Sequence, residues 1–182
     1  MILKRLQLKS AWVESTNCYI IQDEETKEAL VIDPAGELEK ITEMLDILEA
    51  KLKYIYLTHC HADHIGASAQ LHMNCGGKIL IHRNGAQNLE NDDTVLASYI
   101  GADKIILEAD SRIDDEDLLH IGNIEFKVLH TPGHTNCSTS LYCEEYKMIF
   151  SNGDIWQCAE AIGANCCGRR CKFTFKDSEL DH

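Results

Sequence analysis

Residues 58–64 gather three histidines and one aspartate at the end of a predicted strand. The four side chains are His59, His61, Asp63 and His64. They follow an apolar run, Tyr54 to Leu57, whose length and composition predict a buried β-strand. Burying imidazole and carboxylate groups without partners is costly, so packing gives no reason for such a cluster. Neutral imidazole and carboxylate are ligands of zinc and related divalent cations, and the segment therefore predicts a metal site.

A second histidine-containing loop follows another strand-like run, Ile124 to Leu129. This loop spans residues 130–135 and has the sequence His-Thr-Pro-Gly-His-Thr. The two prolines of the chain, Pro34 and Pro132, both lie in turns that end predicted strands beside candidate site residues. Rigid turns of this kind are suited to presenting ligands from a folded scaffold.

The composition limits the class of protein. A chain of 182 residues with 45 % hydrophobic content can bury one substantial core, so a single domain over residues 1–182 is predicted. The net charge of −13 argues against nucleic acid and anionic membranes as partners, because their phosphates repel an acidic protein. No apolar stretch approaches the roughly 20 residues of a membrane-spanning helix. Without a secretory signal, the nine irregularly spaced cysteines predict reduced thiols and a cytoplasmic location.

The hydrophobic pattern predicts strands first, then alternating strands and helices, then strands again. The clearest helix covers residues 37–52, because apolar residues recur there at helical spacing, and a shorter helix is predicted from residue 66 to about residue 74. Strands are predicted at residues 1–8, 18–22, 29–33, 53–58, 78–82, 118–121, 124–129, 138–143 and 148–151. This order favours two sheets with helices on the outside.

The segment Thr58 to His64 resembles the His-x-His-x-Asp-His signature of the metallo-β-lactamase superfamily. Further segments are similar to its small hydroxyacylglutathione-hydrolase-like (glyoxalase II-like) branch and occur in the same order. They are residues 16–19, 31–34, 130–135 and 153–154. The resemblance covers about residues 1–154 and implies an α/β fold, a four-layer αββα sandwich with a dinuclear metal site at one edge of the sheets.

Carried over to this chain, the resemblance implies six metal ligands: His59, His61, Asp63, His64, His134 and Asp154. One ion would be held by His59, His61 and His134. The second ion would be held by Asp63 and His64, and Asp154 would bridge the two ions. Up to two Zn²⁺ ions are therefore expected, with iron or manganese as alternatives. Asp63 is also the predicted catalytic residue, because a carboxylate there would orient the nucleophile and pass a proton to the leaving group.

Residues beside these positions receive separate interpretations. Asp33 either holds a ligand imidazole from behind or is only a turn former before proline, and both interpretations stay open. His130 is expected to be structural or to support a ligand without touching metal. Cys60 lies between two ligands, and its side chain is expected to point away from theirs, free and unreactive. The histidines without a partner pattern are interpreted as ordinary packing or surface residues: His72, His82 and His120.

The resemblance stops after Asp154. Residues 155–182 carry four of the nine cysteines and no apolar periodicity. The family would continue with a strand, a helix and a loop whose histidine completes the second metal site. His182 does not follow such elements and is not counted as a ligand. The fold is therefore expected to be incomplete at its C-terminus, through truncation or a shifted reading frame, with an exposed sheet edge that promotes self-association. A cysteine-metal knuckle in this tail is disfavoured, because its spacing lacks paired C-x₂-C units.

The leading functional prediction is a hydrolase that cleaves a thioester or similar small acyl compound with a metal-bound hydroxide. Its substrate is expected to be a small molecule. Glutathione specificity is not predicted, because fuller relatives carry a C-terminal substrate-binding extension. An alternative on the same fold is an iron-dependent persulfide dioxygenase, which metal analysis would distinguish. A third interpretation is a truncated, catalytically impaired protein that binds at most one metal ion.

Overall fold

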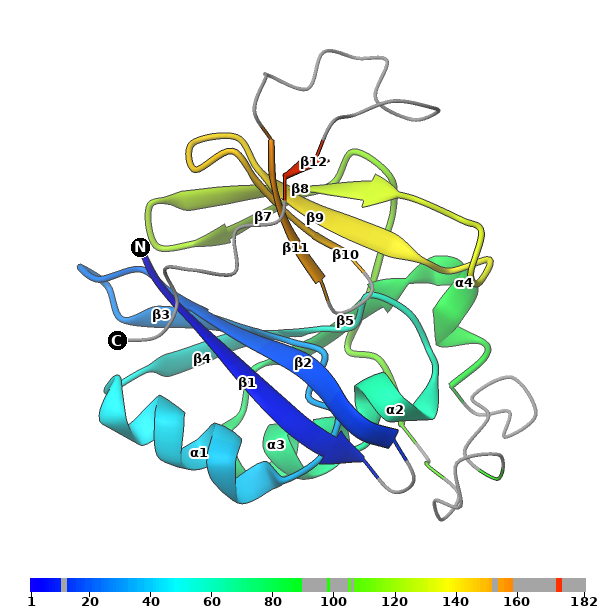
Figure 1. Cartoon of the computed structure of the whole chain (residues 1–182), viewed down its shortest axis with the longest axis horizontal. Coiled ribbons are helices and arrows are strands. Elements are labelled where there is room, and N and C mark those ends of the chain that lie inside the picture. Colours follow the sequence, from blue (N-terminus) through cyan, green and yellow to red (C-terminus); the bar gives the residue numbers. More distant parts are fainter. Residues whose placement is uncertain are drawn as a thin grey trace.

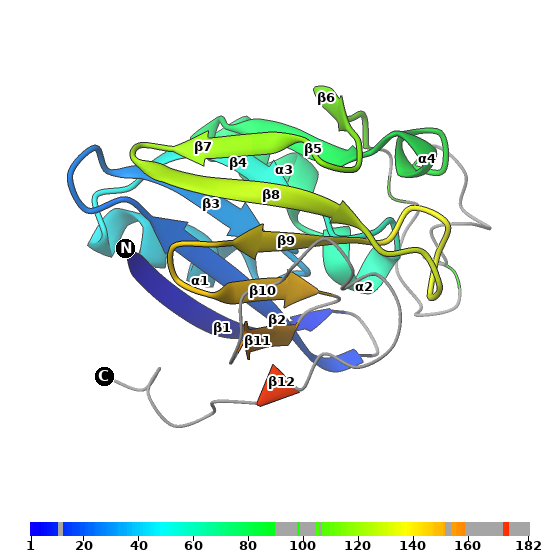
Figure 2. The ribbon, with the colours of Figure 1, turned by 90° about the horizontal axis from the view of Figure 1, so that it is seen from above.

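The computed structural model describes residues 1–10, 13–89, 98, 105 and 107–151, and the strands at 154–158 and 173–174 through their backbone. The first sheet consists, in hydrogen-bonded order, of β1 (Ile2–Ser10), β2 (Val13–Gln22), β3 (Glu28–Ile32), β4 (Lys51–Tyr56), β5 (Lys78–His82) and β6 (Ser111–Ile113). The second consists of β7 (Leu118–Ile121), β8 (Ile124–His130), β9 (Thr139–Cys143), β10 (Met148–Ser151), β11 (Asp154–Cys158) and β12 (Phe173–Thr174), in the same sequential order. The sheets lie face to face, which confirms the predicted two-sheet α/β fold (Figures 1 and 2).

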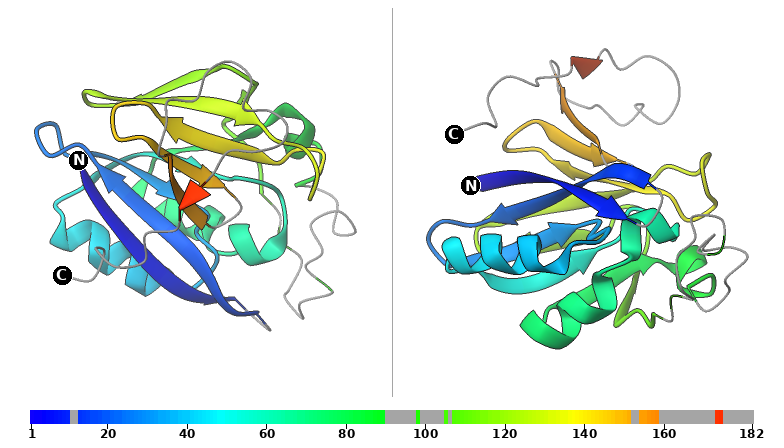
Figure 3. Two further views of the ribbon diagram at one scale, coloured as in Figure 1. Left: turned by 45° about the horizontal axis from the view of Figure 1, so that its top comes forward. Right: turned by 60° about the horizontal axis from the view of Figure 1, so that its bottom comes forward.

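Helices lie against the first sheet. They are α1 (Leu38–Ile47), α2 (Ala62–Ile65), α3 (Ser68–Cys75) and α4 (Arg83–Ala86). Figure 3 shows α1 and α3 on the outer face of the first sheet, away from the second sheet. Within the part of the chain that the structure describes, no helix lies on the outer face of the second sheet, so three of the four predicted layers are seen. None of the described helices is long and apolar enough to cross a bilayer.

Two apolar cores hold these layers together. The core between the sheets contains large side chains of both: Tyr19, Ile21, Leu30, Ile32, Tyr56, Ile121, Phe126 and Phe150. The core between the first sheet and its helices includes Leu8, Ile20, Val31, Ile41, Leu45, Ile55 and Leu57. The first sheet is therefore buried on both faces, which explains why residues 29–32 are continuously apolar rather than alternating.

The strand pairing places the functional loops at one edge of the molecule. Strands β3, β4, β5 and β6 pair in parallel, so their carboxyl ends point the same way. Asp33 follows β3, the histidine-rich loop follows β4, and His82 ends β5. In the second sheet His130 ends β8, and the backbone N–H of Thr139 donates to the carbonyl of Thr58 at 2.8 Å. The two predicted ligand-bearing loops therefore meet.

The helix predicted over residues 37–52 is shorter than expected. It begins at Leu38 and ends at Ile47, and Lys51 is already the first residue of β4. A positive φ of 50° at Glu49 turns the chain, and the N–H of Lys51 then donates to the carbonyl of Lys27 at 2.7 Å. Pairing with the neighbouring strand β3 therefore overrides helical periodicity at these residues.

Candidate metal centre

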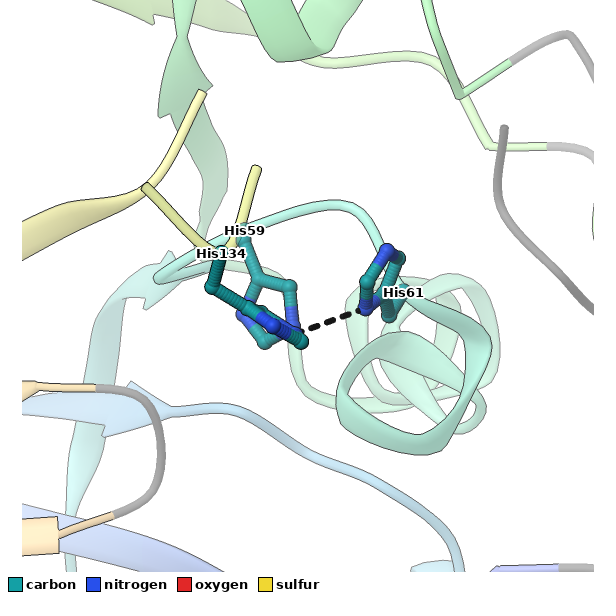
Figure 4. A group of neighbouring side chains, drawn as sticks. All are labelled: His59, His61 and His134. Carbon is teal, nitrogen blue, oxygen red and sulfur yellow. Dashed lines mark hydrogen bonds between the residues drawn. The ribbon is translucent and has the colours of Figure 1, made fainter. Parts of the chain in front are cut away.

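Three imidazoles converge where the loops after β4 and β8 meet (Figure 4). His59 follows β4, His61 is the N-cap residue of α2, and His134 comes from the loop between β8 and β9. His134 Nε2 and His61 Nδ1 are 3.0 Å apart, and one ligand atom from each of the three histidines lies within 4.8 Å of the others. The structure thus brings together the three histidines predicted for the first ion.

His59 carries a buried nitrogen without a protein partner. His59 is 1 % exposed, and its ring nitrogen Nδ1 lies 3.0 Å from Thr58 Oγ1. Its other ring nitrogen, Nε2, is buried and has no hydrogen-bond partner among the described residues. An unpaired buried polar atom is costly, typically by about 1–3 kcal/mol. A divalent cation held with His61 and His134 would satisfy this nitrogen, so the residues fit a metal ion.

Asp33 orients two of the histidines from behind. Its Oδ2 accepts hydrogen bonds from Thr58 Oγ1 at 2.7 Å and from His64 Nδ1 at 2.9 Å, and its Oδ1 accepts the Thr58 N–H at 2.8 Å. Because the Thr58 hydroxyl donates to Asp33, its lone pair is left to accept Nδ1–H of His59. Both histidines then keep an Nε2 lone pair available to a metal. Of the two interpretations of Asp33, the structure shows the contact with an imidazole, that of the predicted ligand His64.

Asp63 and His64 lie on the short helix α2, beside the three imidazoles. The His64 ring centroid is 4.3 Å from that of His59, and its Nε2 is 3.6 Å from Asp63 Oδ2. The Asp63 side chain is 27 % exposed, so it can meet both a metal and a substrate. Asp33, His59 and His64 also form a group with ligand-type spacing. Asp33 accepts three hydrogen bonds there, so we assign it as support for the ligands.

Asp154 is the first residue of β11, and its side chain lies outside the described residues. The strand register places the backbone of Asp154 opposite Ser151 of β10. The same row of paired residues continues across the sheet through Ser140 of β9 to Leu129 of β8. This row lies one residue from the end of β8, on the side of the loop that carries His134. The bridging role of Asp154, like the other metal-ligand roles, stays a prediction.

The surroundings of His59 and His61 favour the neutral form of these two imidazoles. Burial, followed by the charges that His64, His61 and His134 would carry, lowers the pKa of His59 to about 2. Burial and the neighbouring His134 also lower the pKa of His61. Metal ligation requires an unprotonated imidazole nitrogen, so these environments favour cation binding at neutral pH.

The sequence model of the metallo-beta-lactamase superfamily matches residues 11–152 of this chain. The chain belongs to the metallo-β-lactamase superfamily. The predicted family is confirmed, and the match ends close to residue 154, where the resemblance was expected to stop. Membership agrees with the two facing sheets and with the position of the histidine cluster at their edge.

Curated relatives in this superfamily include enzymes of two kinds. The hydroxyacylglutathione hydrolase GloC of Haemophilus influenzae is 32 % identical over 143 residues, which cover 78 % of this chain and 67 % of the relative. The mitochondrial persulfide dioxygenase ETHE1 of Homo sapiens is 28 % identical over 158 residues, which cover 86 % of this chain and 52 % of the human enzyme. The chain spans about half to two thirds of the length of the curated relatives it matches.

Solved structures of this superfamily have the same arrangement of sheets. The BLEG-1 B3 metallo-β-lactamase superposes with a TM-score of 0.74 at 30 % identity, covering 82 % of this chain and 71 % of that one. The structure of TTHA1623 in a di-iron-bound form superposes with a TM-score of 0.67 at 27 % identity. The match covers 81 % of this chain and 70 % of TTHA1623. Iron therefore occurs in at least one solved structure that is similar to this chain.

Acid is expected to destabilise the metal-free protein between pH 6.5 and 5. An unfolded histidine has a pKa of about 6.5, whereas the folded pKa of His59 is about 2. The unfolded state therefore binds the extra proton in this window, and each such histidine lowers the unfolding free energy by about 1.4 kcal/mol per pH unit. Burial also lowers the pKa of His82, which acts in the same direction. The contribution of these neutral, buried histidines to the unfolding free energy is complete above pH 6.5 and is lost as the pH falls.

Urea unfolding in the presence of a chelator at pH 7.5, 6 and 5 measures this dependence. Carboxylates change protonation mostly below about pH 5, so they contribute little within this window. His120 is exposed, and a His120→Gln control should keep the slope, whereas His59→Asn should reduce it. An unfolding free energy that stays constant from pH 7.5 to 5 would contradict the assignment of buried neutral imidazoles.

Gly66 is a site residue that the motif analysis missed. It directly follows α2, and a Cβ at this position would lie 2.3 Å from the backbone oxygen of Ala35. The adjacent N–H of Ala67 donates to the carbonyl of Pro34 at 2.8 Å. The helix that carries Asp63 and His64 is therefore docked directly on the turn after β3. A glycine two residues after the signature was the available signal.

Gly66→Ala is expected to destabilise the protein by about 1–3 kcal/mol and to weaken zinc binding, because the methyl group forces α2 away from a backbone atom. Urea unfolding and zinc titration measure the two effects. Gly133→Ala is the matched control, since a Cβ at Gly133 meets nothing within 4 Å. Equal stability of the two variants would show that close docking of α2 is unimportant.

His82 and His130 support the loop that carries His134. Their rings stack with centroids 4.0 Å apart and an interplanar angle of 7°. His130 Nε2 donates to the carbonyl of Asn136 at 3.0 Å, which closes the base of the loop. This is the structural role expected for His130. His82 is a buried packing residue, in agreement with its interpretation from the sequence. Its stacking partner His130 lies 48 residues later in the chain and could not be recognised from the sequence.

Proposed function

We propose that this protein is a metal-dependent hydrolase of thioesters or similar small acyl compounds. The observation that carries the proposal is the convergence of His59, His61 and His134 around the unpartnered Nε2 of His59. A divalent cation bound there supplies an activated water and polarises a substrate carbonyl. The relationship to hydroxyacylglutathione hydrolase GloC supports the choice of reaction class.

Asp63 is the proposed acid–base residue. It lies in the first turn of α2, partly exposed, with its carboxylate next to the His64 ring. A carboxylate in this position accepts a proton from the attacking water and returns it to the leaving group. A thiol has a pKa of about 8.5, so a thiolate leaves with little protonation. This favours thioesters over amides, whose amine leaving groups need a full proton.

The proposed substrate is a small molecule, in keeping with the acidic surface. A net charge of −13 disfavours nucleic acid and anionic membranes as partners. We also propose a cytoplasmic location, which suits the five described cysteines, all of them free thiols. Self-association through an exposed sheet edge stays a prediction.

A turnover assay on the full chain tests the proposal. The protein is reconstituted with zinc and offered acyl-glutathione and acyl-coenzyme A thioesters, a lactone and a phosphodiester. Thioester hydrolysis that disappears with a chelator and in a His59→Ala variant supports the proposal. Hydrolysis that survives both treatments would place the activity elsewhere, and a lack of turnover on every thioester would overturn the substrate class.

A persulfide dioxygenase is the second candidate, favoured by the similarity to the human mitochondrial enzyme. The three converging imidazoles suit iron as well as zinc. Oxygen consumption with glutathione persulfide, measured on iron-loaded and zinc-loaded samples, separates the two candidates. Consumption by the iron form, without hydrolysis by the zinc form, would favour the dioxygenase.

A further inference from the structure

Two cysteine sulfurs touch where the two histidine-bearing loops of the candidate metal centre meet. Cys60 Sγ and Cys137 Sγ are 3.6 Å apart, and both residues are 0 % exposed. Cys60 lies between His59 and His61, whereas Cys137 is three residues after His134. One thiol thus belongs to each of the two loops that supply the converging imidazoles. Cys60 is free, as expected from the sequence, but its partner thiol could not be foreseen.

The surroundings fix both sulfurs in this position. Thr135 Oγ1 lies 3.2 Å from Cys137 Sγ, and Asn88 Nδ2 lies 3.9 Å from Cys60 Sγ. The Asn88 side chain also donates to Asn136 Oδ1 at 3.3 Å, so the same amide contacts both loops. The two cysteines are therefore buried between the two loops, where the side chains of Asn88 and Thr135 contact their sulfurs.

We propose that Cys60 and Cys137 form an oxidation site at which a small hydroperoxide, such as hydrogen peroxide, converts the two thiols into a disulfide. One thiol, as its thiolate, attacks a peroxide oxygen, becomes a sulfenic acid and releases one water after proton transfer. The other thiol then displaces the sulfenic oxygen as a second water and forms the S–S bond. The sulfurs lose two electrons and the peroxide gains them. Burial of both sulfurs restricts the oxidant to a small molecule.

The disulfide acts on metal binding through the loops. An S–S bond is about 2.05 Å long, so the sulfurs must approach each other by roughly 1.5 Å. Cys60 is covalently linked to His59 and His61, and it would be pulled toward the loop of His134. Ligand positions must hold to within about 0.5 Å for a working site. Oxidation therefore lowers the affinity for a divalent cation, and reduction restores it.

The test uses the reduced full chain, hydrogen peroxide and zinc alone as the metal probe. After oxidation, free thiols are alkylated and the peptides are mapped by mass spectrometry. The expected product links the peptides of Cys60 and Cys137. Zinc affinity, measured against a chromophoric chelator, should fall by roughly 10-fold or more and recover with a phosphine reductant. Oxidised glutathione, which is bulkier, should react more slowly.

Cys137→Ser should bind zinc equally well before and after peroxide treatment, whereas Cys75→Ser should behave as the unmodified chain, because Cys75 is exposed on α3. Oxidation of Cys75 without the Cys60–Cys137 link would overturn the proposed site. A link formed without any change in zinc affinity would overturn its effect on the metal centre. Both outcomes are read on the unmodified chain, so they stand if Cys137→Ser fails to fold, and neither depends on the proposed thioesterase activity.

Discussion

Replacement of Asp63 by asparagine is expected to lower thioester turnover by roughly 10²–10⁴-fold while the fold is retained, a loss typical of a missing acid–base group. Asparagine has nearly the same shape but accepts no proton at neutral pH. The side chain is 27 % exposed and contacts the His64 ring, and Asp63 belongs to neither apolar core, so both cores are undisturbed. The measurement is kcat on a thioester, with thermal unfolding recorded beside it.

The control for this variant is Asp46→Asn, an exposed aspartate on α1, on the outer face of the first sheet. It should leave turnover within error of the unmodified chain. Zinc content must be measured in parallel, because Asp63 is also a predicted ligand. Unchanged turnover in the Asp63→Asn protein would remove the proposed mechanism, although the fold and family would stand.

The convergence of the imidazoles could be predicted because it depends on strand ends and local spacing. Four candidate ligands within residues 59–64, three histidines and one aspartate, define one loop, and the resemblance identifies His134 as their partner on another. Parallel pairing of β3 with β4 then brings the Asp33 turn beside that loop. The β-hairpin around Gly122 was equally visible, because the dipeptide Gly122-Asn123 favours a tight hairpin turn, and Gly122 has a positive φ of 54°.

Other features depend on contacts between distant residues and were invisible in the sequence. The contact between Cys60 and Cys137 joins positions 77 residues apart. The helix α2 begins within the signature itself, where no helix was predicted. Its four residues are too few for a periodic pattern, and its docking at Gly66 depends on a backbone oxygen 31 residues earlier.

Asp33 offers the sharpest test of how the imidazoles are held. Replacement by asparagine is expected to weaken zinc binding by roughly 10–100-fold, the usual cost of losing a partner behind a metal ligand. Asparagine tolerates the positive φ of 51° at this position, and its carbonyl oxygen still accepts the Thr58 N–H. Its NH₂ group, however, replaces the carboxylate oxygen that accepts from Thr58 Oγ1 and His64 Nδ1.

An amide donor there forces Nδ1 of His64 to accept, so the ring proton moves to Nε2, where a metal needs a lone pair. The Thr58 hydroxyl likewise loses its acceptor, and His59 loses its fixed tautomer. Zinc titration against a chelator measures the effect. The control is Asp23→Asn, a buried, hydrogen-bonded aspartate at the opposite end of β3, which should alter stability without altering zinc affinity. Equal zinc affinity in Asp33→Asn and the unmodified chain would mean that the tautomers are set by the metal alone.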